Sequence, residues 1–486
     1  MPKSATSAPP VSGAEAAFVP RPRWWHPLAL FGPAFVASIA YVDPGNVAAN
    51  LTSGAQYGYL LVWVLVLANA MAVLIQFQSA KLGIVTGMTL PEHVGARTRP
   101  WPRRAFWLQA ELVAAATDIA EVIGGALALN LLFGLPLVLG GAIVGVVSMV
   151  LLLVQSSRRQ RSFEFIIIGL LAVIAVGFLA GLFVSDVDWL AAADGLVPRF
   201  EGAPTVLLAA SMLGATVMPH AIYLHSALAR DRHHAAFAAE AENSDFTLGA
   251  PSVSHPKRRS FWSPRRLRAP ADGASSENSV VVDDGRGSEG EGPRPHGAGA
   301  ERLRGLLRVT RADVVIALVL AGAVNIAMLL LAASSLRGVD GTDTIPGAYD
   351  AIAAALGPAI ATIFAIGLLA SGLASTSVGA YAGSVIMKGL LRVRVPILAR
   401  RVVTLIPALI VLGAGIDPTW ALVLSQVLLS IGIPFALIPL IRLTGNRAVM
   451  GEFADRMPVK VTAWTVVALI VALNVVLIVL TVTGAA

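Results

Sequence analysis

The chain has 486 residues, of which 56% are hydrophobic and only 13% are charged, and its mean hydropathy is +0.74. Soluble globular domains carry about 25% charged residues, so this composition excludes that class and predicts an all-α polytopic membrane protein. The chain contains no cysteine, which excludes disulfides and thiolate metal sites. The net charge of +7 does not indicate nucleic-acid binding, because in a membrane protein the position of positive charge matters more than its sum.

Apolar stretches that are long enough to cross a membrane recur along the whole chain. Roughly 18 or more apolar residues cross a hydrocarbon layer of about 30 Å at about 1.5 Å per residue. The tail at 1–27 has no separate apolar segment of the signal-peptide type, so the first span is expected to direct its own insertion. The sequence predicts eleven spans, at 29–54, 58–82, 105–132, 136–155, 164–184, 204–229, 312–334, 357–387, 398–414, 418–440 and 460–482.

Lysine and arginine are distributed unevenly between the loops that join these spans. Of the 36 basic residues, 34 fall on the side of the N-terminal tail, and only Arg199 and Arg337 fall on the other side. Because basic loops stay in the cytoplasm, the N-terminus is predicted to be cytoplasmic and the C-terminus, after eleven spans, to lie outside. The expected location is the plasma membrane, which in bacteria is the inner membrane.

The first span is interrupted by Asp43, Pro44, Gly45 and Asn46, in the segment YVDPGNVAAN. Pro44 has no N–H group, so carbonyl groups one turn upstream lose their helical partners. Unpaired carbonyls are costly in lipid, and the break is therefore predicted to face a cavity, a ligand or other protein. An acid at this depth, such as Asp43, is expected to serve the function.

The third span carries three acids, Glu111, Asp118 and Glu121, at i, i+7 and i+10. At about 100° per residue they fall on one stripe of the helix, and three acids cannot face lipid. They form either a proton relay or a network of salt bridges with Arg400 and Arg401 at the start of span nine, and the two roles can coexist.

The sixth span repeats the design of the first, because the segment ATVMPH at 215–220 divides it into two apolar halves around Pro219. The two broken spans hold matching places if spans one to five and six to ten are two repeats. Five is an odd number, so the second repeat enters the membrane from the opposite side. A pair of broken spans in matching positions of inverted repeats indicates the mid-membrane site of a transporter.

The polar segment 232–305 interrupts the pattern and is predicted to be a disordered cytoplasmic insert, because it has too little apolar surface to fold. Its basic stretch 257–268, with Phe261 and Trp262, either touches anionic lipid or is a plain solvated linker. The predicted organisation is a tail at 1–27, the first repeat at 28–185, span six with its preceding loop at 186–231, the insert at 232–305, spans seven to ten at 306–441, and span eleven with the C-terminus at 442–486.

Together the two breaks predict a cation site. Free carbonyls, the negative ends of two half-helices, the Asp43 carboxylate and the Asn46 amide oxygen would all meet there. The thioether of Met218 favours a borderline transition ion such as Mn²⁺ or Fe²⁺, and with them Co²⁺ or Cd²⁺, over Mg²⁺ and Ca²⁺. The alternative for Met218 is ordinary packing.

Two segments, DPGNVAANLTSGAQYGY and GATVMPHAIYLHSAL, resemble the signature segments of the Nramp (natural resistance-associated macrophage protein) family of proton-coupled manganese and iron transporters. ATDIAEVIG, LLASGLASTSVGAYAG and RRVVTLIPA also look like family segments, so the resemblance covers essentially every span. It implies a LeuT-like fold of two inverted five-helix repeats plus an eleventh C-terminal helix. The insert and Ala374, where a more polar residue is expected, depart from the family pattern.

The resemblance also implies residue roles. Metal contacts are expected from Asp43, Asn46, Met218 and the carbonyl of Ala215, with the carbonyl near Ala40 and the side chain of Gln426 joining when the ion is enclosed. The implied proton route is separate from the metal path. It runs from Asp43 past His220 and Glu121 to Asp118 and towards Glu111, Arg400 and Arg401.

The implied function is proton-coupled import of these ions by alternating access, with the metal as substrate and no cofactor. The expected partners are metal ions, protons and the lipid bilayer, with no nucleic acid and no obligate protein. A Na⁺-coupled amino-acid symporter of the same fold is the main alternative, although it has no use for Asp43 beside Met218. A channel would need a continuous pore lined by rings of groups. A membrane metalloprotease would need a motif such as His-Glu-x-x-His, which the sequence lacks, so no catalytic residues are assigned.

Overall fold

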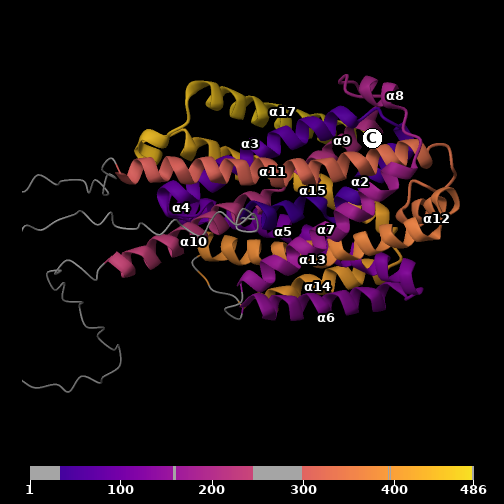
Figure 1. Ribbon diagram of the computed structural model, residues 1–486, viewed down its shortest axis with the longest axis horizontal. Helices are drawn as coiled ribbons and strands as arrows, with labels where there is room; N and C mark the ends of the chain where they lie inside the picture. The colour runs from indigo at the N-terminus through magenta and orange to yellow at the C-terminus, as the bar shows by residue number, and fades with distance from the viewer. Residues whose placement is uncertain (1–32, 157–159, 245–297, 392, 394–395, 484–486) are drawn as a thin grey trace, which may run out of the picture.

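The computed structural model describes residues 33–156, 160–244, 298–391, 393 and 396–483. In these residues all regular structure is helical. The long helices lie side by side along the longest axis of the molecule, as Figure 1 shows. We call its two ends the α4 end, which holds α4, the end of α10 and the start of α11, and the α8 end, which holds α8 and α12.

Each of the eleven predicted spans coincides with one helix or one broken pair of helices. The first repeat consists of α1 (Pro33–Ser38), η3 (Ile39–Val42) and α2 (Pro44–Tyr57), then α3 (Val62–Thr86), α5 (Pro100–Phe133), α6 (Leu137–Ser156) and α7 (Gln160–Val184). The second repeat consists of α9 (Ala203–Thr216) and α10 (Pro219–Ser244), then α11 (Ala298–Ser335), α13 (Pro358–Leu390), α14 (Ile397–Gly413) and α15 (Pro418–Thr444), and α17 (Met457–Val482) follows it. The connections contain α4 (Leu90–Arg97), α8 (Trp189–Asp194), α12 (Ile345–Leu356), α16 (Arg447–Met450) and η4 (Gly451–Phe453).

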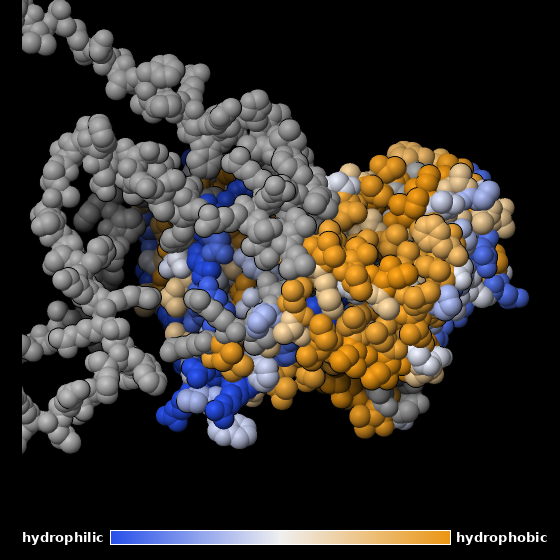
Figure 2. Space-filling view, turned by 90° about the horizontal axis from the view of Figure 1, so that it is seen from below, coloured by the Kyte–Doolittle hydropathy of each residue, from blue (hydrophilic) through white to orange (hydrophobic). Residues whose placement is uncertain are grey.

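Seven helices of the described residues are long and apolar enough to cross a membrane, with α9 and the start of α10 counted together as one. They are α3, α5, the α9–α10 pair, α11, α13, α15 and α17. The other predicted spans are the broken α1–α2 segment, α6, α7 and α14, which has only 17 residues. Figure 2 shows the matching surface, a broad apolar belt between polar regions at the two ends, and this chain is therefore a membrane protein.

The insert departs from its predicted bounds. α10 continues to Ser244 and α11 begins at Ala298, so the described residues at both ends of 232–305 are helical rather than disordered. The segment HHAAFAAEAE, rich in alanine and glutamate, has a high helix propensity and extends α10 beyond the membrane. Residues 245–297, with the basic stretch 257–268, and the tail at 1–27 lie outside the described residues.

Side-chain caps and prolines fix the helix boundaries near the site. Pro44 is the first residue of α2, where its missing N–H costs nothing. Pro219 likewise opens α10, whereas Pro434 lies inside α15. Pro434 leaves the Ser430 carbonyl without its helical donor, and Asn474 Nδ2 of α17 donates to that carbonyl at 3.1 Å. The Asn474 side chain of α17 thus satisfies a backbone carbonyl of α15 that the proline leaves unpaired.

The centre of the molecule is built around the two broken segments. α2 packs against α11, α9 packs against α15, and α5 packs extensively against α13. Both breaks are fully buried, since Asp43 and Met218 are each 0% exposed. The fold therefore encloses the predicted site on all sides.

Candidate metal centre

Asp43 lies between η3 and α2 in extended backbone conformation, and its carboxylate caps α2. Oδ1 accepts hydrogen bonds from the backbone N–H of Asn46 at 2.8 Å and from Asn46 Nδ2 at 2.7 Å. Oδ2 accepts a hydrogen bond from Gln426 Nε2 at 3.1 Å. The start of a helix favours a carboxylate, so α2 itself stabilises this buried charge.

The Asn46 amide joins the two breaks. Its Nδ2 group also donates to the carbonyl of Ala215 in the last turn of α9, at 3.0 Å. Asp43, Asn46, Ala215 and Gln426, from three separate spans, thus meet in one cluster. The sequence analysis expected the amide oxygen of Asn46 to face the site. In the structure the amide nitrogen faces Asp43 and Ala215 instead.

Two amide oxygens at this cluster, Asn46 Oδ1 and Gln426 Oε1, are buried and have no hydrogen-bond partner in the described part of the chain. Rotation of each side-chain amide by about 180° exchanges its nitrogen and oxygen and would direct the oxygen at a cation beside Asp43. Nowhere in the described residues do three or more His, Cys, Asp or Glu side chains gather as they would in a resident metal site. The donors here are one carboxylate, two amides, one carbonyl and a neighbouring thioether.

The carbonyls freed at the first break are bound by other helices. The Tyr41 carbonyl accepts a hydrogen bond from Asn325 Nδ2 of α11 at 2.8 Å, and the Val42 carbonyl accepts one from Ser371 Oγ of α13 at 2.5 Å. Asn50 of α2 holds Asn325 in place through a hydrogen bond of 3.1 Å to its Oδ1. The break therefore faces protein at these two positions.

Three glycines allow the close approach of the backbones around the cluster. A Cβ atom on Gly45 would lie 1.8 Å from Gln426 Nε2, and one on Gly214 would lie 2.0 Å from the Gln426 carbonyl oxygen. A Cβ atom on Gly124 of α5 would lie 2.1 Å from the Cβ of Pro44. A larger residue at Gly214 or Gly124 would require a helix to move, and one at Gly45 would displace the Gln426 side chain.

Among the described residues, no hydrogen bond joins the other two predicted ligands, Met218 and Ala40, to Asp43. Met218 is buried in the turn between α9 and α10, three residues beyond Ala215. Ala40 is buried within η3, and among the described residues no hydrogen bond joins it to the cluster. These two remain predictions from the sequence.

His220, in the first turn of α10, connects the break to α5. Its Nδ1 atom lies 3.4 Å from Thr117 Oγ1, and Thr117 immediately precedes Asp118. Both His220 and Asp118 are buried. The structure therefore brings the second break next to the acidic stripe of α5.

The acids of α5 meet the arginines of α14, as the salt-bridge interpretation expected. Arg400 Nε donates to Glu111 Oε1 at 2.8 Å, and another nitrogen of Arg400 lies 3.8 Å from Asp118 Oδ2. Arg401 approaches the other oxygen of Asp118 at 3.5 Å. Glu121 is buried beside Asp118 but has no ion pair among the described residues.

Two glycines of α13, Gly379 and Gly383, leave room for this ionic cluster. A Cβ on Gly383 would lie 2.0 Å from the guanidinium carbon of Arg400. One turn earlier, a Cβ on Gly379 would lie 3.2 Å from Glu121 Oε1 and 3.3 Å from Asp118 Oδ1. Small residues four apart let polar groups and backbones come together inside a membrane bundle.

Known proteins resemble this chain over nearly its whole length. A family model described as natural resistance-associated macrophage protein-like matches residues 34–480. The chain belongs to the Nramp family. It is 52% identical over 455 residues to the divalent metal cation transporter MntH of Mycobacterium tuberculosis strain H37Rv, covering 94% of this chain and 92% of that protein.

Solved structures give the same fold for this Nramp chain. The manganese transporter of Eremococcus coleocola, solved in complex with an aromatic bis-isothiourea substituted compound, is 28% identical, with a TM-score of 0.71 over 92% of this chain and 86% of that one. MhsT in complex with L-phenylalanine shares only 12% identity, with a TM-score of 0.53 over 94% of this chain and 99% of that one, and this likeness concerns the fold alone. The predicted LeuT-like fold of two inverted five-helix repeats and an eleventh helix is confirmed.

Several polar residues of this Nramp chain were missed by the sequence analysis. Asn325, Ser371 and Thr117 support the predicted site residues from other helices. Arg401 is held by Ser148 Oγ at 3.0 Å and by Thr376 Oγ1 at 3.4 Å. The small-residue spacing at 379 and 383 was the one usable signal, because single Ser, Thr and Asn residues in a span have too many roles to be assigned.

Proposed function

We propose that this Nramp chain imports divalent transition metal ions, Mn²⁺ or Fe²⁺ and with them Co²⁺ or Cd²⁺, across the plasma membrane in symport with protons. The metal is the substrate rather than a cofactor, and no enzymatic step is involved. Access alternates between the two sides of the membrane around the junction of the broken segments α1–α2 and α9–α10. The N-terminus is cytoplasmic and the C-terminus outside.

The observation that carries the proposal is the meeting of Asp43, Asn46, the Ala215 carbonyl and Gln426 at the two breaks. A buried carboxylate with amide and carbonyl oxygens around it offers a divalent cation charge compensation and hard ligands. Met218 adds the softer ligand that favours transition ions. The names of the relatives, a divalent metal cation transporter and a manganese transporter, support the same substrate class.

In the proposed cycle the ion displaces the amide N–H groups that now hold Asp43. Asn46 and Gln426 turn their free oxygens towards the metal, and the ligand bonds that they form replace the hydrogen bonds that their amide nitrogens now donate. Because Gln426 belongs to α15 and Asn46 to α2, ion binding would draw these two helices together. This differential contact is what lets an ion bias one conformation over another.

The proposed proton route leads from Asp43 past His220 to the acids of α5. The Thr117–His220 contact and the cluster of Glu111, Asp118, Arg400 and Arg401 support a route that is separate from the metal path. Glu121 lies in this region without an ion pair among the described residues and is our candidate for the titrating relay group.

The decisive experiment is Mn²⁺ uptake into proteoliposomes with an imposed pH gradient. The wild type should accumulate Mn²⁺ faster when the outer side is acidic, with acidification of the lumen reported by a trapped dye. Asp43→Asn keeps the shape and removes the charge, so its uptake should fall to background. Asp340→Asn, at an exposed position of the α8 end, is the control and should transport normally. Normal uptake by correctly inserted Asp43→Asn would refute the site.

A second measurement separates the proton route from the metal site. Glu121→Gln should retain Mn²⁺ uptake while its acidification and pH dependence shrink. If Glu121→Gln and Asp118→Asn both leave proton flux unchanged, the α5 acids form only a structural salt-bridge network.

A further inference from the structure

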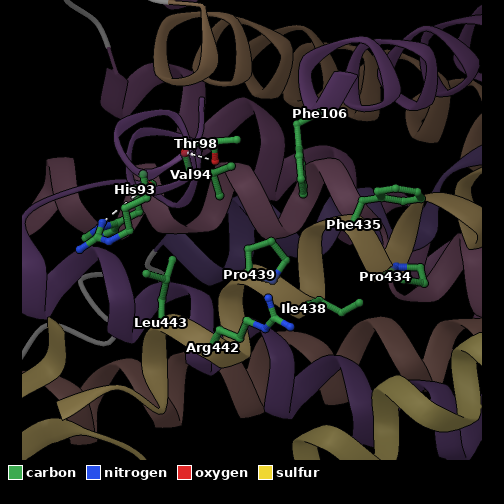
Figure 3. A pocket seen from close by; sticks show the side chains of 11 residues that line it. His93, Val94, Thr98, Phe106, Pro434, Phe435, Ile438, Pro439, Arg442 and Leu443 are labelled. Carbon is green, nitrogen blue, oxygen red and sulfur yellow. Dashed lines mark hydrogen bonds between the residues drawn. The ribbon is translucent and has the colours of Figure 1, made fainter. Parts of the chain in front are cut away.

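A groove of about 450 Å³ opens towards the α4 end, between α4, the start of α5 and the second half of α15. Figure 3 shows the α4 and α5 side chains, such as Val94, Thr98 and Phe106, facing those of α15. Phe106 and Phe435 are in edge-to-face contact, with ring centroids 6.3 Å apart. The remaining lining residues are His93, Arg97, Pro434, Ile438, Pro439, Arg442 and Leu443.

The groove has cationic side chains in its lining and contains no acid. Among its eleven lining residues are two arginines, Arg97 and Arg442, and neither Asp nor Glu. Both arginines are exposed, and within the described residues Arg442 has no hydrogen bond or ion pair. Other acids at this end of the protein, such as Glu92 and Asp455, are already paired, with Arg230 and Lys81 respectively.

Arg97 is held in place by His93. Its Nη1 atom lies 2.6 Å from His93 Nδ1 and 3.5 Å from the His93 carbonyl oxygen. Burial, together with the neighbouring Arg97 charge, lowers the pKa of His93 to about 4, so at neutral pH the ring is uncharged and Nδ1 accepts the hydrogen bond. The arginine is thus oriented in advance, and its remaining N–H groups are left for a ligand.

The rest of the groove is apolar and runs along the membrane normal. From Arg442 back to Pro434 the α15 face extends about 12 Å at about 1.5 Å per residue. Phe435 is 43% exposed, so this wall is open to the surrounding lipid rather than sealed in the protein. A ligand that complements this groove has an anionic group, which binds the arginines, and a hydrocarbon chain, which lies along the apolar wall.

We propose that this groove binds an anionic phospholipid, with the phosphate at the exposed arginines of its lining, Arg97 and Arg442, and an acyl chain along Phe106, Phe435 and Ile438. Among the described residues neither arginine has an acidic partner, and the charge complementarity of two such cations at the rim of the apolar belt commits the site to a lipid rather than to a peptide or a free anion. Because α15 carries Gln426, lipid binding at its far end is positioned to act on the helix that closes the metal cluster.

The test uses the purified full-length protein in detergent and counts retained lipids by native mass spectrometry as phosphatidylglycerol, phosphatidylcholine or inorganic phosphate is titrated. The wild type should retain phosphatidylglycerol over phosphatidylcholine and show no effect of inorganic phosphate. The Arg97→Gln, Arg442→Gln double variant should bind phosphatidylglycerol about 30-fold more weakly, at about 1 kcal/mol for each charge removed. Arg442→Gln alone, an exposed and unpaired position, guards against misfolding and should lose about fivefold by the same scale.

The matched control removes two other exposed arginines of the same end, Arg447→Gln with Arg456→Gln, and should bind like the wild type. The proposal is overturned by equal binding of phosphatidylcholine, by unchanged binding in the Arg97, Arg442 variants, or by an equal loss in the control. An equal mass shift with inorganic phosphate would also overturn it.

Discussion

The two possible roles of Met218, metal ligand and packing residue, predict different effects of its replacement. Replacing it by alanine opens a gap beside a polar site, where water can take the vacated coordination position. We expect Met218→Ala to retain Mn²⁺ uptake, to lose most Cd²⁺ uptake, and to admit competition by Ca²⁺ or Mg²⁺, because only oxygen ligands then remain. Uptake of Mn²⁺, Cd²⁺ and Ca²⁺ measured side by side in proteoliposomes tests this ranking.

The control for Met218 is Met212→Ala, a change of the same size at a fully buried position within α9. A packing loss of about 2–5 kcal/mol there should lower transport of all metals alike. An unchanged metal ranking in Met218→Ala would remove the thioether from the proposed ligand set.

At single positions the sequence was informative where a charged side chain lies in a segment that is otherwise apolar enough to cross the membrane. Asp43 and the α5 acids stand out because lipid does not tolerate them, and the cluster of Asp43, Asn46, Ala215 and Gln426 follows the resemblance. The groups that hold them, such as Asn325 and Ser371, could not be assigned. Each is an ordinary polar residue until the fold places it opposite a freed carbonyl.

At the level of helices, the contact between α13 and the ionic cluster depends on glycine. Gly383→Ala would push a methyl group into the Arg400 guanidinium, and overpacking of this kind costs about 1–3 kcal/mol. We expect a lower midpoint of thermal unfolding and weaker pH dependence of Mn²⁺ uptake. Gly367→Ala on the same helix meets nothing closer than 3.6 Å and should change neither, so an equal effect of both variants would contradict the assignment.

The helices that border the insert define a cleaner deletion than the sequence alone would. Removing 245–297 and joining Ser244 to Ala298 by a short Gly/Ser linker keeps all of α10 and α11. We expect Mn²⁺ uptake to persist, because each halving of a loop's length changes its closure free energy by only about 0.6 kcal/mol, and a shorter loop lowers the cost of closure. Loss of uptake by a well-inserted deletion protein would give the insert a role in transport.

The positions of the spanning helices could be predicted from the lengths of the apolar stretches. Their ends could not. The apolar windows located all eleven segments, since the membrane imposes their length. The extension of α10 to Ser244 and the short α8 and α12 lie outside the apolar windows, where propensity and local caps such as Asp188 and Thr344 decide.

For the whole molecule, the orientation can be tested directly because the chain has no cysteine of its own. Single cysteines at exposed positions of the two ends, Asp340→Cys and Arg456→Cys, serve as reporters. In intact cells a membrane-impermeant maleimide should label Asp340→Cys, and it should label Arg456→Cys only after permeabilisation. The reverse pattern would place the N-terminus outside.

The ionic cluster between α5 and α14 has a consequence for electrical behaviour. Three carboxyl groups, those of Glu111, Asp118 and Glu121, share the region with two guanidinium groups, so the fully ionised cluster carries one net negative charge. One bound proton makes it neutral. Moving one elementary charge through a potential of 100 mV is worth about 2.3 kcal/mol, so under the proposed proton symport a proton leaving this cluster towards the cytoplasm would couple the cycle to voltage. An inside-negative membrane would then drive uptake even where the pH is equal on both sides.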